Sequence, residues 1–149
     1  MLVLGIDPGT IRMGYGLVRS GPNPQAEDYG VIALPKTMPL EQRLHQLYTH
    51  ILNMISIFQP DVIAVEDPFV GKGERRFAAS ALALGQAQAV VLMGGAGQGL
   101  PIFRYAPSQV KLAVANYGAA SKEQMQQSVT ATLNLSENPE TDAADALSV

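Results

Sequence analysis

Four acidic residues of this chain are spaced so that together they could hold divalent metal ions. Asp7 follows the apolar run at residues 1–6, and Glu66 follows a second apolar run at residues 62–65. Continuous apolar runs are typical of strands that are buried on both faces. An acid at the last position emerges at the carboxyl edge of the sheet, where open α/β sheets place their sites. Asp142 and Asp145 are three residues apart, so on a helix they share one face.

This set of acids predicts one particular chemistry. Oxygen-only ligands select Mg²⁺ or Mn²⁺ over zinc, and the chain has no cysteine and only two histidines. Two such ions can stabilise the attacking water and the leaving 3′ oxygen of a phosphodiester displacement without a protein nucleophile. We therefore predict a two-metal nuclease site that binds two Mg²⁺, with Mn²⁺ able to substitute.

Each acid also has an ordinary explanation when it is taken alone. Asp7-Pro8-Gly9 has the residue order of a simple turn, and Glu66 could be a strand-end acid that faces water. Asp142 could be a first-turn acid stabilised by the helix dipole. Asp145 is harder to explain in this way, because it lies among alanines and a leucine that would pack on the sheet, and a buried carboxylate needs a partner.

The elements that must position these acids follow from the apolar pattern. Strands are expected at residues 1–7, 13–19, about 29–34, 61–66 and 101–105. An amphipathic helix is expected across residues 40–58, and an Ala/Gly-rich helix should end near residue 99. Further helices are expected at 108–117, at 121–133 after a capping box, and from about 141. The order predicts a single α/β domain over residues 1–149, in which a five-stranded mixed sheet with the first strand central is flanked by helices. The first three strands should be antiparallel neighbours, and the last two should be parallel.

The charge distribution favours a phosphate-bearing partner despite a net charge of −3. Residues 72–122 carry six basic residues against Glu74 alone, a local net charge of +5, and local field governs phosphate attraction. A solvated basic face with no partner remains the alternative. The basic residues are Lys72, Arg75, Arg76, Arg104, Lys111 and Lys122.

The Ala/Gly-rich stretch at residues 78–99 raises the question of a membrane span. It contains a serine and three glutamines, and its Ala and Gly are only weakly apolar, so it lacks the predominantly apolar run that a span requires. The N-terminus has no basic leader or cleavage site typical of a signal peptide. We expect no membrane association and a cytoplasmic protein.

The sequence resembles the RuvC-type Holliday junction resolvases of the RNase H-like superfamily from its first strand to its last residue. The motifs that carry the resemblance are Gly5-Ile-Asp-Pro-Gly-Thr10, Gly14-Tyr-Gly16, Glu66 with Phe69, Ala83-Leu-Gly-Gln-Ala87, Tyr105-Ala-Pro-Ser-Gln-Val-Lys111, Ser121-Lys-Glu-Gln124, Asn138-Pro139 and Asp142-Ala-Ala-Asp-Ala-Leu147.

The resemblance implies an RNase H-like fold and an endonuclease that nicks four-way DNA junctions symmetrically, leaving 5′-phosphate and 3′-hydroxyl ends. It implies that Asp7, Glu66, Asp142 and Asp145 are the catalytic metal ligands. Lys111 and Lys122 match the two functional lysines of the family. Phe69 matches an aromatic residue that stacks on a base, with a small satellite core as its alternative, and Lys72, Arg75 and Arg76 would contact phosphates. The implied partners are a second copy of the chain, paired through the Ala/Gly-rich helix, and a branch-migration motor.

Two departures from the family pattern have consequences. Relatives commonly carry Arg where Gln88 stands and are often basic overall, so we expect DNA affinity to be weaker or differently distributed here. The chain also stops four residues after Asp145, where relatives extend the helix. We therefore expect a truncated C-terminus and a frayed backbone at Asp145, because so short a helix is marginal in isolation.

Three other functions remain open at this point. A junction-binding module without cleavage would share most of these features. An actin-like nucleotide-binding fragment has a similar Asp-x-Gly-Thr loop, although 149 residues cannot supply the two domains that such proteins use. Another RNase H-like nuclease would differ in its preference among junction, duplex and RNA–DNA hybrid substrates.

Overall fold

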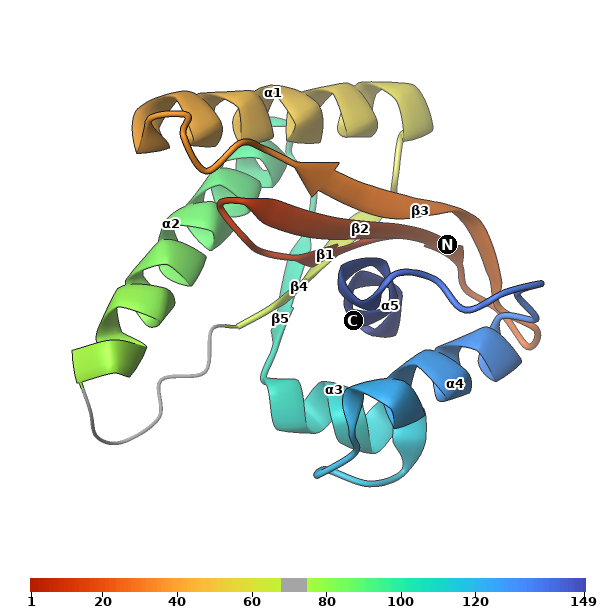
Figure 1. Cartoon of the computed structure of the whole chain (residues 1–149). Coiled ribbons are helices and arrows are strands. Elements are labelled where there is room, and N and C mark those ends of the chain that lie inside the picture. The colour runs from red at the N-terminus through yellow and green to blue at the C-terminus, as the bar shows by residue number, and fades with distance from the viewer. Residues whose placement is uncertain (68–74) are drawn as a thin grey trace.

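The chain folds around one twisted sheet, as shown by a computed structural model that describes residues 1–67 and 75–149, the side chains of residues 75–78 excepted (Figure 1). Within these residues the sheet has five strands in the order β3-β2-β1-β4-β5. The elements are β1 (Leu2–Asp7), β2 (Arg12–Arg19), β3 (Gln25–Ala33), α1 (Leu40–Phe58), β4 (Val62–Glu66), α2 (Arg75–Gly97), β5 (Ile102–Tyr105), α3 (Pro107–Ala115), α4 (Lys122–Thr132) and α5 (Thr141–Ser148).

The strand pairing confirms the predicted mixed sheet with β1 at its centre. β1 and β2 are antiparallel, as are β2 and β3, whereas β1 pairs with β4 and β4 with β5 in parallel. Ile6 is the register partner of Val65. Asp7 and Glu66, the next residues on these two strands, therefore emerge side by side at the same edge of the sheet.

The third strand is longer than its sequence indicates. We predicted a start near Tyr29, but β3 begins at Gln25 and pairs with β2 back to Arg19, with a register irregularity between Leu17 and Val18. The added residues are mostly polar because β3 is an edge strand with one partner, so no apolar run marks them. An ion pair between Arg19 and Glu27 joins the two strands there.

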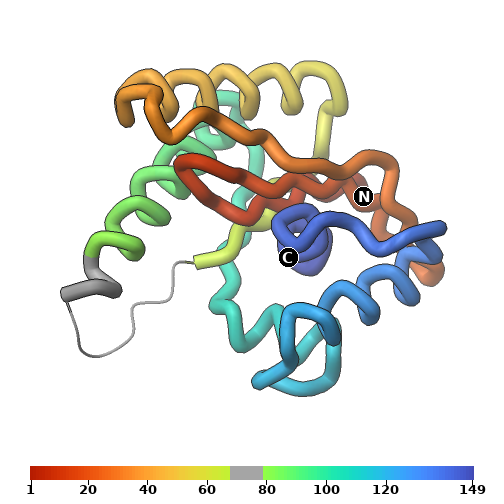
Figure 2. Tube along the Cα trace, viewed as in Figure 1, coloured from red at the N-terminus to blue at the C-terminus, as the bar shows by residue number. Residues whose placement is uncertain are grey.

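Helices cover both faces of the sheet. α1 and α2 pack against one face, while α5 lies on the other, with α3 and α4 beyond it (Figures 1 and 2). The predicted apolar stripe of α1 supplies Leu47, Ile51 and Met54 to the main core, which also contains Leu4 and Ile6 of β1. The central strand is therefore buried on both faces, as its uninterrupted apolar run predicted.

The helix α2 is apolar enough, over Ala79–Gly97, to pass a length and composition test for a membrane span, with a mean hydropathy of 1.3. One face of the helix is nevertheless part of the domain core, where Ala87, Val90 and Val91 are buried. The C-terminal part of the helix also packs against α1 (Figure 1). Packing in the described part of the chain accounts for this buried face, whereas only 33% of the apolar window is buried in total.

Three glycines allow α5 to lie directly on the sheet. A Cβ atom at Gly5 would be 2.2 Å from the carbonyl oxygen of Ala146, and one at Gly14 would be 1.9 Å from that of Asp142. A Cβ at Gly16 would be 2.7 Å from the side chain of Leu147. Such contacts are closer than packed carbon and oxygen atoms tolerate, so only glycine fits at these positions.

The short helix α5 is consequently well anchored. Its buried residues are Ala143, Ala144, Ala146 and Leu147. The expectation that Asp145 lies on a frayed backbone is therefore wrong, because packing on the sheet supplies the stability that an isolated helix of eight residues would lack.

Candidate active site

The four predicted acids line one cleft at the carboxyl edge of β1 and β4. The cleft has a volume of about 690 Å³, and the two predicted lysines also line it. Its charged lining residues are Asp7, Glu66, Lys111, Lys122, Asp142 and Asp145. The structure thus brings together six charged residues that come from five different elements.

The positions of Asp7 and Glu66 disfavour the charged forms of their carboxyl groups. Burial and, after it, the negative charges of Asp145, Glu66 and Asp142 together raise the pKa of Asp7 to about 8, against the opposite effect of Lys122. Burial and then the charge of Asp145 raise the pKa of Glu66 to about 7, against the opposite effects of Lys111 and Lys122. The site therefore holds more negative charge than its own cations compensate.

The two acids of α5 each face a cation. Asp142 Oδ2 accepts a hydrogen bond from Arg12 Nε at 2.6 Å. Asp145 Oδ2 lies 4.0 Å from Lys122 Nζ. Burial raises the pKa of Asp145, Lys122 lowers it, and Asp142 raises it. Both acids come from the helix face that points toward the strand ends.

The two lysines are positioned by helix starts. Lys122 is the first residue of α4, and the predicted capping box that precedes it is present: Ser121 Oγ accepts from the Gln124 backbone N–H at 3.2 Å, and Gln124 Oε1 accepts from that of Ser121 at 2.8 Å. Lys111 lies on α3, whose start is held by the Ala106 N–H donating to Gln109 Oε1 at 2.8 Å. Local capping thus fixes where both ammonium groups enter the cleft.

The side chains present fit hard divalent cations chemically, although no tight cage is formed among the described residues. Within residues 1–67 and 75–149, no three His, Asp or Glu side chains are close enough to share one ion. The donors are all carboxylate oxygens, which suit Mg²⁺ and Mn²⁺, and the raised pKa values of Asp7 and Glu66 show that added positive charge would be stabilised here.

Some of the predicted DNA-contacting residues cannot be placed. Phe69 and Lys72 lie outside the described residues, and Arg75 and Arg76 begin α2 with side chains that are not described. Arg104, which we counted in the basic segment, pairs with Asp67 through Nε at 2.8 Å. Arg104 therefore has an acidic partner beside the end of β4, which makes it a weaker candidate for a phosphate contact than the composition of the segment indicated.

Sequence reasoning missed several polar residues that support the site. Arg12 contacts Asp142, and the buried Gln88 donates from Nε2 to the Glu66 carbonyl at 3.3 Å and to Asp67 Oδ1 at 2.7 Å. Gln88 was noted only as a departure from the family pattern. For Arg12 a signal existed, because it lies two residues before Gly14 and therefore shares the strand face that the glycine leaves open for another element.

The fold and the site define a class of protein. A central five-stranded mixed sheet in the order β3-β2-β1-β4-β5, with acids at the ends of β1 and β4 and on a C-terminal helix, is the arrangement of an RNase H-like nuclease domain. The yeast mitochondrial Holliday junction resolvase has the same fold, with a TM-score of 0.67 at 17% sequence identity.

Comparisons with known proteins identify the family within this class. A family model described as crossover junction endodeoxyribonuclease RuvC matches residues 3–149. Proteins of that name from Dehalococcoides mccartyi and Chloroflexus aggregans are 45% and 46% identical over the whole chain and are covered to 88% and 90% of their own length. The structure of Thermus thermophilus RuvC in complex with a Holliday junction substrate has a TM-score of 0.89 and is 32% identical, with 100% of this chain and 90% of that one covered. The chain therefore belongs to the RuvC crossover junction endodeoxyribonucleases, a family of Holliday junction resolvases that act in DNA recombination and repair.

Proposed function

We propose that this protein resolves four-way DNA junctions by Mg²⁺-dependent hydrolysis, introducing symmetric nicks that leave 5′-phosphate and 3′-hydroxyl ends. One observation carries the proposal: the cleft at the carboxyl edge of the sheet is lined by four carboxylates and two lysines. Family membership and the Thermus thermophilus complex with a Holliday junction substrate support the choice of DNA substrate.

Asp7, Glu66, Asp142 and Asp145 would hold two Mg²⁺ ions, with Mn²⁺ as a substitute. When bound, such ions supply Lewis-acid stabilisation of the oxygens around phosphorus and lower the pKa of water. The four carboxylates are suited to this role because they are held on rigid elements, two at strand ends and two on a helix that is anchored by close packing.

Lys111 and Lys122 would bind the scissile phosphate and offset the charge that develops as the bond to the leaving oxygen breaks. The cleft lining among the described residues contains neither histidine nor cysteine, so a water molecule is the proposed attacking group. Basic side chains that contact the phosphates of the DNA backbone fix the position of the DNA without reading its base sequence. Phe69, Lys72, Arg75 and Arg76 remain candidates for DNA contacts on the basis of the sequence resemblance.

The first prediction tests the metal assignment. Asp7→Asn should abolish cleavage of a synthetic four-way junction in the presence of Mg²⁺ while leaving junction binding largely intact, because one ligand is lost but the basic surface is kept. Nicking is measured on denaturing gels, and binding is measured by gel shift in Ca²⁺. Glu137→Gln, on an exposed loop, is the control that should behave as the wild type.

The outcome also separates the alternatives. Retained cleavage by Asp7→Asn would contradict the assignment of Asp7. A wild-type protein that binds the junction but nicks it at no Mg²⁺ or Mn²⁺ concentration would instead be a junction-binding module. Equal cleavage of junction, duplex and RNA–DNA hybrid would indicate a different RNase H-like nuclease.

We further propose that the active form is a cytoplasmic homodimer, paired through α2, which cooperates with a branch-migration motor. The support is a stripe on the side of α2 that faces away from the core, where Leu82 and Met93 are 64% and 65% exposed and Ala89 lies exposed between them. Two active sites in one assembly would account for paired nicks, because each protomer would cut one strand.

The second prediction tests this pairing. Replacing both Leu82 and Met93 by Glu should halve the particle mass measured by light scattering after size exclusion, toward the 15.8 kDa of one chain, because buried like charges oppose association. Ile57→Glu, which alters an equally exposed apolar residue on α1 (73%), should leave the mass unchanged. A wild-type protein that is already monomeric, or a double variant that stays dimeric, would refute pairing through this stripe.

A further inference from the structure

We propose that Arg12 is a positioning residue, which holds the Asp142 carboxylate in the orientation that a divalent cation requires. The inference rests on the proposed metal-binding role of Asp142 and extends it to a residue on a different element. Arg12 begins β2, and it is separated from Asp142 by 130 residues of sequence.

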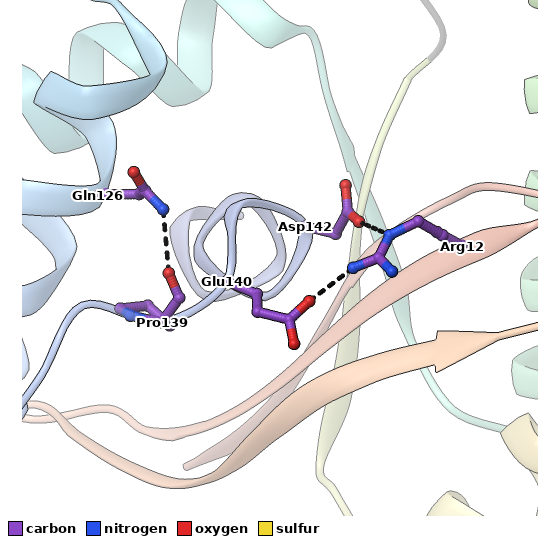
Figure 3. Close-up of polar contacts among 5 residues, drawn as sticks. All are labelled: Arg12, Gln126, Pro139, Glu140 and Asp142. Carbon is purple, nitrogen blue, oxygen red and sulfur yellow. Dashed lines mark hydrogen bonds and ion pairs between the residues drawn. The ribbon is translucent and has the colours of Figure 1, made fainter.

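The guanidinium group of Arg12 donates hydrogen bonds to two acids that lie two residues apart at the start of α5. Nε donates to Asp142 Oδ2 at 2.6 Å, and a terminal nitrogen donates to Glu140 Oε2 at 2.6 Å (Figure 3). Only one oxygen of Asp142 is used, and the other points away from Arg12 (Figure 3). These two hydrogen bonds raise the pKa of Arg12, so the group remains a cation throughout the working pH range.

The path of β2 explains why Arg12 can reach this segment. Side chains alternate along a strand, so Arg12 shares the face of Gly14, where the backbone of Asp142 lies in contact with the sheet. Met13 points to the opposite face and is fully buried in the main core. The guanidinium therefore extends beside α5 at the point where the first turn of that helix meets the strand.

The segment is also held from its other side. Gln126 of α4 donates from Nε2 to the carbonyl of Pro139 at 3.0 Å (Figure 3). The segment that enters α5 is thus held by α4 at the Pro139 carbonyl and by β2 at the side chains of Glu140 and Asp142. Arg12 is the contact in this set that acts on a side chain assigned to metal binding.

The charge of Arg12 and its geometry have opposite effects on cation binding. Its positive charge opposes a nearby dication, whereas its hydrogen bond fixes the rotamer and the free oxygen of Asp142, as supporting hydrogen bonds to metal-ligating carboxylates do. A lysine would keep the charge but could not span both acids, because its ammonium is a single point and not a planar fork. Arg12→Lys therefore isolates the positioning effect.

The third prediction is that Arg12→Lys weakens Mn²⁺ binding roughly tenfold, as expected for loss of a group that orients a ligand. Binding is measured without DNA, from the free Mn²⁺ signal in electron paramagnetic resonance during a titration. The matched control is Arg19→Lys, which makes the same change on the same strand at a residue that pairs with Glu27. This control should bind Mn²⁺ as the wild type does.

A double-variant comparison separates positioning from a structural effect on α5. If Arg12 acts through Asp142, then Arg12→Lys combined with Asp142→Asn should bind Mn²⁺ no more weakly than Asp142→Asn alone. A further loss in the double variant would overturn the proposal, because it would mean that the whole helix had moved. Glu140→Gln, at a side chain that is 70% exposed, should cause a smaller, several-fold loss, and it replaces Arg12→Lys if thermal unfolding shows that variant to be misfolded.

Failure of this inference can be told apart from failure of the proposed function. Unchanged or tighter Mn²⁺ binding by a folded Arg12→Lys would overturn the positioning role while leaving the metal site intact. A wild-type protein that binds no Mn²⁺, or Asp142→Asn with wild-type affinity, would overturn the metal assignment and the positioning role together.

Discussion

At the scale of single residues, the site is defined by carboxylates whose surroundings disfavour their charge. Asp7 is raised to a pKa of about 8 and Glu66 to about 7, mainly by burial and then by neighbouring acids. Perturbed titration of this kind is characteristic of functional sites. The protein keeps these acids in place because the packing of β1, β4 and α5 fixes their backbones.

The fourth prediction concerns stability against pH in buffer without divalent ions. In the folded protein Asp7 and Glu66 keep their protons to a higher pH than in the unfolded chain, where their pKa values are the ordinary 3.8 and 4.5. The contribution of these two groups to the free energy of unfolding should therefore be most favourable below about pH 4 and should fall as the pH rises toward about 8. At about 1.4 kcal/mol per pKa unit, the two shifts together correspond to a loss on the order of 5–10 kcal/mol.

Urea denaturation at a series of pH values in EDTA measures this slope. Asp7→Asn should flatten it and make the variant more stable than the wild type at pH 8, whereas Glu137→Gln should retain the wild-type slope. Addition of Mg²⁺ at pH 8 should stabilise the wild type more than Asp7→Asn. A wild-type stability that rises between pH 5 and 8 would contradict the assigned shifts.

The residues that sequence could identify are those tied to a pattern. Asp7 and Glu66 follow apolar runs, Asp142 and Asp145 share a helical spacing, and the structure places all four in one cleft. Arg12 and Gln88 could not be assigned partners in the same way, because an isolated polar residue has no periodicity and its partner is set by tertiary packing. The resemblance to a family, and not spacing, supplied the substrate and the roles of the lysines.

At the scale of elements, the decisive contact is that of α5 with the sheet. Gly14 and Gly5 bring the helix backbone against the strands, so that Asp142 lies beside Asp7. In the sequence these glycines are visible only as motif positions, without an evident role. Their function is steric, and it becomes visible only when the element that crosses them is known.

The fifth prediction tests this contact. The methyl group that Gly14→Ala adds would lie 1.9 Å from the carbonyl oxygen of Asp142. Because the two atoms cannot be that close, α5 must shift away from the strand. The variant should lose about 1–3 kcal/mol of stability or more in urea denaturation and should bind Mn²⁺ more weakly.

Gly21→Ala is the matched control, because nothing lies within 4 Å of its Cβ position, and it should stay within about 0.5 kcal/mol of the wild type. Equal stability and equal Mn²⁺ affinity of the two variants would show that α5 is not seated on the glycines.

The helices and strands were predictable where one physical signal dominated. The apolar stripe of α1 and the capping box of α4 predicted those helices, and short connections predicted the antiparallel strands. The predicted start of β3 was wrong because an edge strand lacks the continuous apolar run by which a buried strand is recognised. The frayed α5 was wrong because propensity alone does not account for packing.

At the scale of the whole molecule, the local placement of charged residues matters more for phosphate binding than the net charge. The chain has a net charge of −3, yet lysines from α3 and α4 stand at the cleft beside its acids. A phosphate would meet net positive charge there once divalent cations offset the four acids, and it is this local field that governs encounter. The topology was predictable, because a strand-helix-strand order requires a right-handed crossover and parallel pairing.

The glycine-lined seat of α5 has a consequence for how the protein is made. β1 and β2 emerge from the ribosome first, with Gly5 and Gly14 exposed, while Asp142 and Asp145 are translated after every other described element. Domains fold as units during synthesis, so the proposed metal site is completed only when α5 docks on the sheet. A chain terminated before α5 would keep the strands of the sheet but lack Asp142 and Asp145, so it would lack two of the four proposed metal ligands and should not cleave DNA.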